Sequence, residues 1–177
     1  MSVTLLDYTD EIGMQLETIL QAQLPAYFAE MDSATRPPVP VAYYQGSVLL
    51  QLQPTSLPSI TVSDEPPGGF NWSPIGLSVD SASQTPYGEE QYHFNVYYAL
   101  EYRGTQQAHR VARKAGACIQ AVLQKYALHN ELNPPAVWKD GIAGKVVIAS
   151  HADVQGGHTI CLAVVPFDCV AYPTMRV

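Results

Sequence analysis

Four side chains near the end of the chain could bind a metal ion. Two thiols and two imidazoles fall within the last thirty residues, at Cys161, Cys169, His151 and His158. Zinc prefers such sulfur and nitrogen ligands, but the paired spacings typical of zinc sites are missing. Cys161 also lies inside an apolar strand pattern, where a thiol usually behaves as a small hydrophobe. We therefore interpret these residues as structural, and we predict neither a metal site nor a cofactor.

Two pairs of adjacent carboxylates offer a second chemistry, the binding of a divalent metal ion for phosphodiester hydrolysis. Both pairs lie in Pro/Gly-rich stretches, where solvated loop acids are the simpler interpretation. A small metal-dependent nuclease or hydrolase of phage DNA metabolism stays an alternative function. Its candidate residues are Asp64, Glu65, Glu89 and Glu90, with Lys139 or Lys145 as an assisting group.

A thiol–imidazole pair is the third candidate, formed by Cys118 with His109 or His129. Cys118 falls on the apolar stripe of an expected helix and His109 on its polar face, so buried packing explains the cysteine better. The sequence also lacks the Gly-x-Ser-x-Gly, Walker-type, His-Glu-x-x-His and Cys-x-x-Cys motifs. We predict no catalytic residues and a protein that is not an enzyme.

Composition narrows the possible classes of protein. A chain of 177 residues with 47% hydrophobic residues suits one globular domain over 1–177. The net charge of −7, without a basic run, disfavours sequence-specific nucleic-acid binding. No apolar run has the length of a membrane span, and the first residues do not form a signal peptide, so we expect an unprocessed cytosolic product. Three cysteines argue against a disulfide framework.

The elements that must position these residues centre on one stretch. From Tyr92 to Tyr102, apolar and aromatic side chains alternate, which predicts a half-buried antiparallel strand. At a rise of roughly 3.3 Å per residue this strand is unusually long, so part of it is expected to project or bend. From Thr105 to Tyr126 the apolar period changes to three and four residues, which predicts a long amphipathic helix.

The flanking segments predict the remaining elements. Tyr8–Met31 reads as a first helix, kinked or divided by Pro25. A strand at Val41–Tyr44 and another at Ser47–Gln53 look like a hairpin. A Pro/Gly-rich loop insertion follows at about 54–90; its apolar bursts at Ser59–Val62 and Ile75–Val79 suit either strands or irregular loops.

Closing strands are predicted at Lys145–Ala149 and His158–Val165. Phe167–Tyr172 continues the latter after a break at Pro166. The resulting fold class is α+β, with a mainly antiparallel β-sheet flanked by two long α-helices.

Two surface features suggest contact with other proteins. Arg110, Arg113 and Lys114 place a third of the 9 basic residues on one helix face, which suits an acidic partner, although a solvated face explains them equally. Some of the 11 tyrosines, such as Tyr97, could point outward from strands into an interface, although a second buried sheet face explains them as well. The interface candidates are Arg110, Arg113, Lys114, Tyr97, Glu101 and Arg103.

This order of elements resembles the lambda-type tail terminator and tail-completion proteins of long-tailed bacteriophages. The resemblance rests on the N-terminal helix through Ile12 and Phe28, the strand at 38–44, the strand His93–Tyr102, the helix Thr105–Tyr126 and the strand His158–Val165. It is one of order, without a diagnostic motif, and the insertion at 54–90 departs from it.

The resemblance implies a structural virion protein of the tail or neck, made in the host cytoplasm. Six copies would form a ring that terminates tail-tube growth and joins the tail to the head. Tail-tube and head-connector proteins would be its partners, and DNA would pass through the ring without sequence-specific binding. Another neck or baseplate subunit is an alternative.

Overall fold

The computed structural model describes residues 9–46, 57–64, 90–102, 105–127, 137–152 and 159–171. They form two long helices, one short 3-10 helix and six strands. In chain order these are α1 (Thr9–Ala29), η1 (Ser33–Thr35), β1 (Ala42–Gln45), β2 (Ser59–Ser63), β3 (Glu90–Tyr102), α2 (Thr105–Lys125), β4 (Trp138–Ala143), β5 (Val147–Ala152) and β6 (Thr159–Ala171).

The six strands make one mainly antiparallel sheet, as predicted. Its order is β1-β2-β3-β6-β4, and β5 pairs with β6 beside β4. Only β1 and β2 run parallel. The central pair is β3 with β6, joined in register from Glu90–Ala171 to Tyr102–Thr159. The long strand therefore does not project alone, because β6 accompanies it over its whole length.

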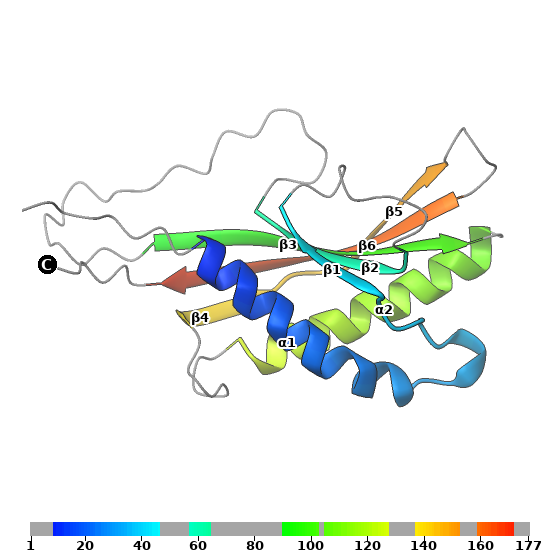
Figure 1. The fold of residues 1–177 in the computed structure, drawn as a ribbon, viewed down its shortest axis with the longest axis horizontal. Helices are drawn as coiled ribbons and strands as arrows, with labels where there is room; N and C mark the ends of the chain where they lie inside the picture. The colour runs from blue at the N-terminus through cyan, green and yellow to red at the C-terminus, as the bar shows by residue number, and fades with distance from the viewer. Residues whose placement is uncertain are drawn as a thin grey trace, which may run out of the picture.

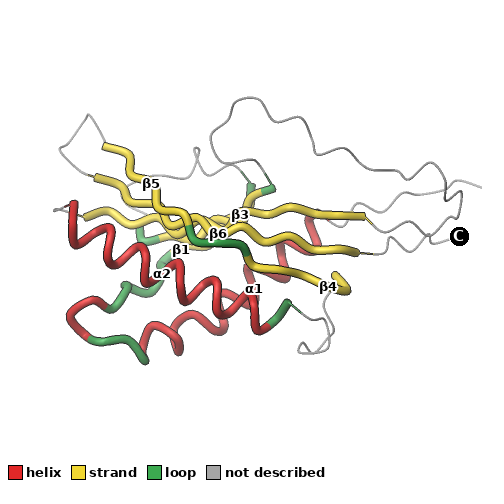
Figure 2. Tube along the Cα trace, turned by 180° about the vertical axis from the view of Figure 1, so that it is seen from behind, coloured by secondary structure: helices red, strands yellow, loops and turns green. Residues whose placement is uncertain are grey.

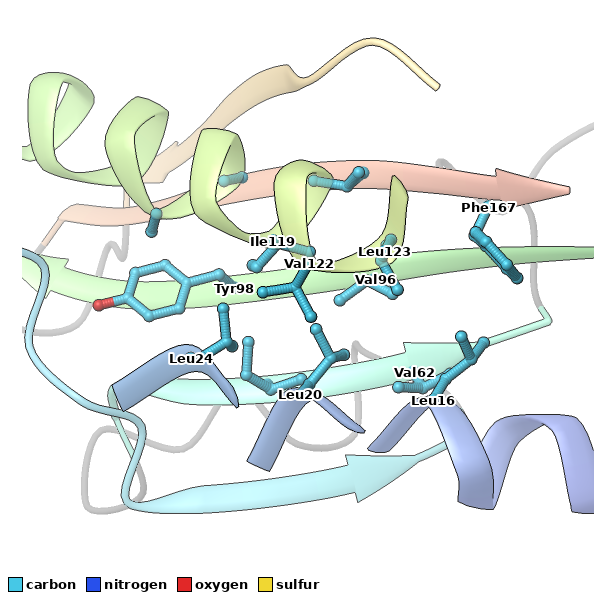
Figure 3. Close-up of a cluster of buried hydrophobic side chains, with 14 of the residues drawn as sticks. Leu16, Leu20, Leu24, Val62, Val96, Tyr98, Ile119, Val122, Leu123 and Phe167 are labelled. Atoms are coloured by element: carbon cyan, nitrogen blue, oxygen red, sulfur yellow. The ribbon is translucent and has the colours of Figure 1, made fainter. Parts of the chain in front are cut away.

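Both helices lie on the same face of the sheet (Figures 1 and 2). The main core fills the space between them and alternate residues of β2, β3 and β6. This arrangement follows from the sequence pattern, since residues two apart in a strand share a face. Figure 3 shows the centre of this core, with Leu16, Leu20 and Leu24 of α1, Val62 of β2, Val96 and Tyr98 of β3, Ile119, Val122 and Leu123 of α2, and Phe167 of β6.

The first helix is one piece, so its predicted division at Pro25 is wrong. Its carboxyl end is completed by Arg36, whose Nη2 donates to the carbonyls of Ala29 and Met31, each at 3.0 Å. Carbonyls in the last turn have no partner within a helix, so this guanidinium supplies one. The Tyr98 hydroxyl donates to the Pro38 carbonyl at 2.9 Å and ties the following extended segment to the sheet.

The break predicted at Pro166 lies in the neighbouring strands and not in β6 itself. The Pro166 carbonyl accepts a hydrogen bond from the Gly144 amide at 2.7 Å. Since the nitrogen and oxygen of one strand residue point to the same side, the proline nitrogen also faces β4 and β5. It has no hydrogen to donate there. The ladder is interrupted at this point, which is where β4 ends and β5 begins.

Strand β4 was not predicted, and a β-bulge explains why. The register with β6 shifts between Trp138 and Asp140. An extra residue in a bulge breaks the alternation of side chains that a sequence pattern relies on. Trp138 anchors the strand: it is buried, its indole donates to the Ala127 carbonyl at 3.2 Å, and its ring meets Phe167 edge-on at 5.5 Å.

The remaining predictions near β1 are partly tested. The strand at Val41–Tyr44 is confirmed as β1, whose described neighbour is the parallel β2. Its proposed hairpin partner at Ser47–Gln53 lies outside the described residues, as does the burst at Ile75–Val79. The burst at Ser59–Val62 is a strand, β2, inside the predicted insertion at 54–90.

Two helical glycines test the close approach of α2 to the sheet. A Cβ at Gly116 would meet Val146 Cγ1 at 2.4 Å and Ala163 Cβ at 3.2 Å, whereas a Cβ at Gly13 of α1 meets nothing nearer than 3.5 Å. Alanine favours helix over glycine by about 1 kcal/mol. We therefore expect Gly13→Ala to stabilise the protein, and Gly116→Ala to destabilise it by about 1–3 kcal/mol through overpacking.

Denaturant unfolding followed by circular dichroism measures both effects. Adding Val146→Ala to Gly116→Ala should relieve the overlap and recover part of the lost stability. Equal stabilisation by the two single substitutions would contradict this close contact.

Candidate functional site

The basic face of α2 divides into free and engaged residues. Arg110 and Arg113 are exposed, and neither makes a hydrogen bond or ion pair with the described residues. Lys114 is half-buried and donates to the Thr35 hydroxyl, which joins α2 to η1. The predicted contact surface on α2 therefore consists of the two arginines, while Lys114 has a structural partner within the chain.

The strand candidates do not join this face. Tyr97 is only 4% exposed and belongs to a second apolar cluster on the face of the sheet opposite the helices. The buried second face is thus the correct explanation for Tyr97, and the outward interface position is wrong. Glu101 is half-buried on the same strand, and Arg103 lies outside the described residues. Of the other tyrosines, Tyr43 and Tyr44 are half-buried, and Tyr172 also lies outside.

The thiols are buried. Cys118, Cys161 and Cys169 are each at most 4% exposed, as the structural interpretation predicts. Burial raises the pKa of Cys118 to about 11, with the nearby Glu30 carboxylate adding to the effect. Burial likewise raises the pKa of Cys169 to about 12, with a further contribution from Asp168. Such thiols stay protonated at neutral pH and are poor nucleophiles and ligands.

The acid pairs are only partly described. Asp64 and Lys145 are exposed, the side chains of Glu90, Lys139 and His151 are not described, and Glu65, Glu89, His129 and His158 fall outside the described segments. Among the described residues, no group of three or more His, Cys, Asp or Glu side chains could hold a metal ion. His109 is half-buried on α2.

A polar cluster that the sequence analysis missed lies at one end of the second sheet face. His93 Nδ1 contacts Asp168 Oδ1 across the β3–β6 pair. The buried Asn95 amide lies 3.4 Å from His93 Nε2. His93 and Asn95 are two apart on β3, which was visible in the sequence, but their position opposite Asp168 depends on the strand register. The cluster fixes this end of the register.

Exposed apolar side chains gather at the sides of the sheet. In the described segments, the exposed large hydrophobic residues are Met14, Val39, Val41, Ile142 and Val147. Met14 belongs to α1, and Val39 and Val41 precede β1. Ile142 and Val147 belong to β4 and β5, the outer strands on the other side. Exposed apolar residues on edge strands are typical of association sites.

The chain matches no protein-family model, and no curated protein sequence is similar to it. None of the described helices has the length and apolar character needed to cross a membrane. The arrangement of elements and charges is therefore the basis for a functional proposal.

Thiol reactivity tests the buried environment of the cysteines. At pH 8, a thiol with a pKa of about 11 is ionised in about one molecule in a thousand, against about a quarter for an unperturbed thiol. We expect native Cys118 and Cys169 to react with a disulfide reagent at least about 100-fold more slowly than in the unfolded chain, as followed by mass spectrometry of labelled peptides. Native rates within tenfold of the unfolded rates would contradict this.

Proposed function

We propose that this chain is a structural subunit of a long-tailed bacteriophage, acting at the head-proximal end of the tail. Six copies form a ring that stops growth of the tail tube and joins the tail to the head. The subunit has no catalytic role. Its partners are other copies of itself, the tail tube and the head-connector proteins.

The order of elements is the observation that carries the proposal. The resemblance to tail terminators rests on an N-terminal helix, a short strand, a long strand, a long helix and a closing strand. The described residues follow this order as α1, β1, β3, α2 and β6, in a single mainly antiparallel sheet. Both long helices cover one face, so the sides of the sheet stay available for neighbouring subunits (Figure 1).

Net charge supports the same role. Each chain carries −7, so a ring of six would present a strongly acidic body to DNA in transit. Like charges repel, which favours sliding of the duplex over adhesion to the ring. A closed cyclic assembly also suits a part that must end the growth of a tube, because closure leaves no interface between subunits unused.

Native mass spectrometry and negative-stain imaging of the purified protein test the ring. We expect a six-fold ring at high protein concentration, with a central hole wide enough for duplex DNA. A chelator should leave the assembly unchanged.

The competing enzyme hypothesis gives the opposite result. It requires metal-dependent cleavage of DNA that is lost on chelation and in the variant with both Glu89→Gln and Glu90→Gln. A protein without a six-fold ring that shows this activity would overturn the structural proposal.

A further inference from the structure

Charge is strongly segregated between the two long helices. Helix α1 contains Asp10, Glu11 and Glu17 and no Lys or Arg. Helix α2 contains Arg110, Arg113, Lys114 and Lys125 and no Asp or Glu. In a chain whose overall charge is −7, this leaves one acidic and one basic helix side by side.

The acidic side of α1 lies along the β1 edge of the sheet. Glu17 Oε2 accepts a hydrogen bond from Gln45 of β1 at 2.9 Å. Positions 10 and 14 lie on the same side of the helix as 17, because residues three, four and seven apart align. Met14 adds an exposed apolar side chain to this row. We call Asp10, Met14, Glu17 and the exposed Val41 before β1 the α1/β1 side; it faces the viewer in Figure 1.

The basic side of α2 lies along the opposite edge. Gln120 donates to the Gly144 carbonyl at 2.8 Å, between β4 and β5, and Gly116 abuts Val146. Arg113 lies three and seven positions before these residues, on the same side of the helix, with Arg110 one turn earlier. We call Arg110, Arg113, Lys145 and the exposed Val147 the α2/β5 side; it faces the viewer in Figure 2.

Strand direction makes the two sides compatible as well as opposite in charge. β1 runs parallel to β2, which is antiparallel to β3. β5 and β3 are both antiparallel to β6 and so run in one direction. β1 and β5 therefore run in opposite directions, and two copies in the same orientation would bring them together as an antiparallel pair. Addition of a strand to a free sheet edge is a common mode of protein association.

We propose that the α1/β1 side of one copy docks against the α2/β5 side of a second copy, head to tail. The arginines of one subunit then face the acids of the next, and Met14 and Val41 approach Val147. A second copy is the occupant that the observations favour, since one chain carries both complementary surfaces. Such a heterologous contact closes into a ring or continues as a filament, depending on the rotation between subunits. Only the closure into six rests on the proposed function.

Charge exchange tests this docking in the full chain. One variant carries Asp10→Lys and Glu17→Lys, and the other carries Arg110→Glu and Arg113→Glu. Each alone places like charges across the contact, so we expect self-association to weaken at least about tenfold in sedimentation velocity. A 1:1 mixture pairs opposite charges at every contact, and we expect it to restore assembly with the two variants alternating, as read by native mass spectrometry.

Glu30→Lys is the matched control. Glu30 is exposed just after α1, on the side that faces Cys118 of α2, and its reversal should leave assembly unchanged. Because the mixture must recover what each variant lost, misfolding of a variant cannot imitate the expected result.

The outcomes separate this docking from the ring function. Failure of the mixture to assemble where the wild-type chain does overturns the docking, and so does a wild-type chain that stays monomeric at about 1 mM. Six-fold rings that both variants form normally leave the ring function standing and overturn the docking. Rescue in the mixture as open filaments upholds the docking and overturns the ring function.

Discussion

The pairing of β3 with β6 is the constraint on which the rest of the structure depends. Thirteen consecutive residues of each strand are joined in one register, and the alternation along them decides what faces the helices. A slip by one residue would turn Val96 and Tyr98 away from α1 and α2 and bring polar Asn95 into the core. The contact between His93 and Asp168 and the buried tyrosine on each face oppose such a slip. With this pair fixed, both helices have only one apolar surface to cover.

The helix layer is held to this pair by very close contacts on one side and by polar ties on the other. At Gly116, α2 approaches the sheet so closely that a methyl group does not fit. On the α1 side, Lys114 contacts Thr35, and the Cys118 thiol lies 4.0 Å from the Tyr27 carbonyl. The result is a two-layer body whose outer helix surfaces differ in charge. In an otherwise acidic chain, this difference gives the subunit a direction.

The sequence was most informative where a periodic pattern runs uninterrupted. The helix predicted at Thr105–Tyr126 ends within one residue of its observed end, and the fold class is confirmed. Prediction failed where local chemistry interrupts the period: a bulge concealed β4, and Pro166 disturbed the neighbouring strands instead of its own. Tyr97 was misplaced for a different reason, because alternation shows that a side chain leaves one face but not that the other face is also covered. The proximity of His93 and Asp168 depends on register, which residue type and spacing do not determine.

The place of β6 in the chain has a consequence for biosynthesis. β6 is the strand to which β3, β4 and β5 all pair, and it is also the last element, ending at Ala171 of 177 residues. Until it has been translated, β3 lacks its main partner and the apolar faces of α1 and α2 have only part of a sheet to cover. Folding must therefore wait for nearly the whole polypeptide, and the long-range closure that completes it is intrinsically slow. During that interval the nascent chain exposes its greatest apolar surface, which makes premature termination more damaging here than in a fold whose central strand comes first.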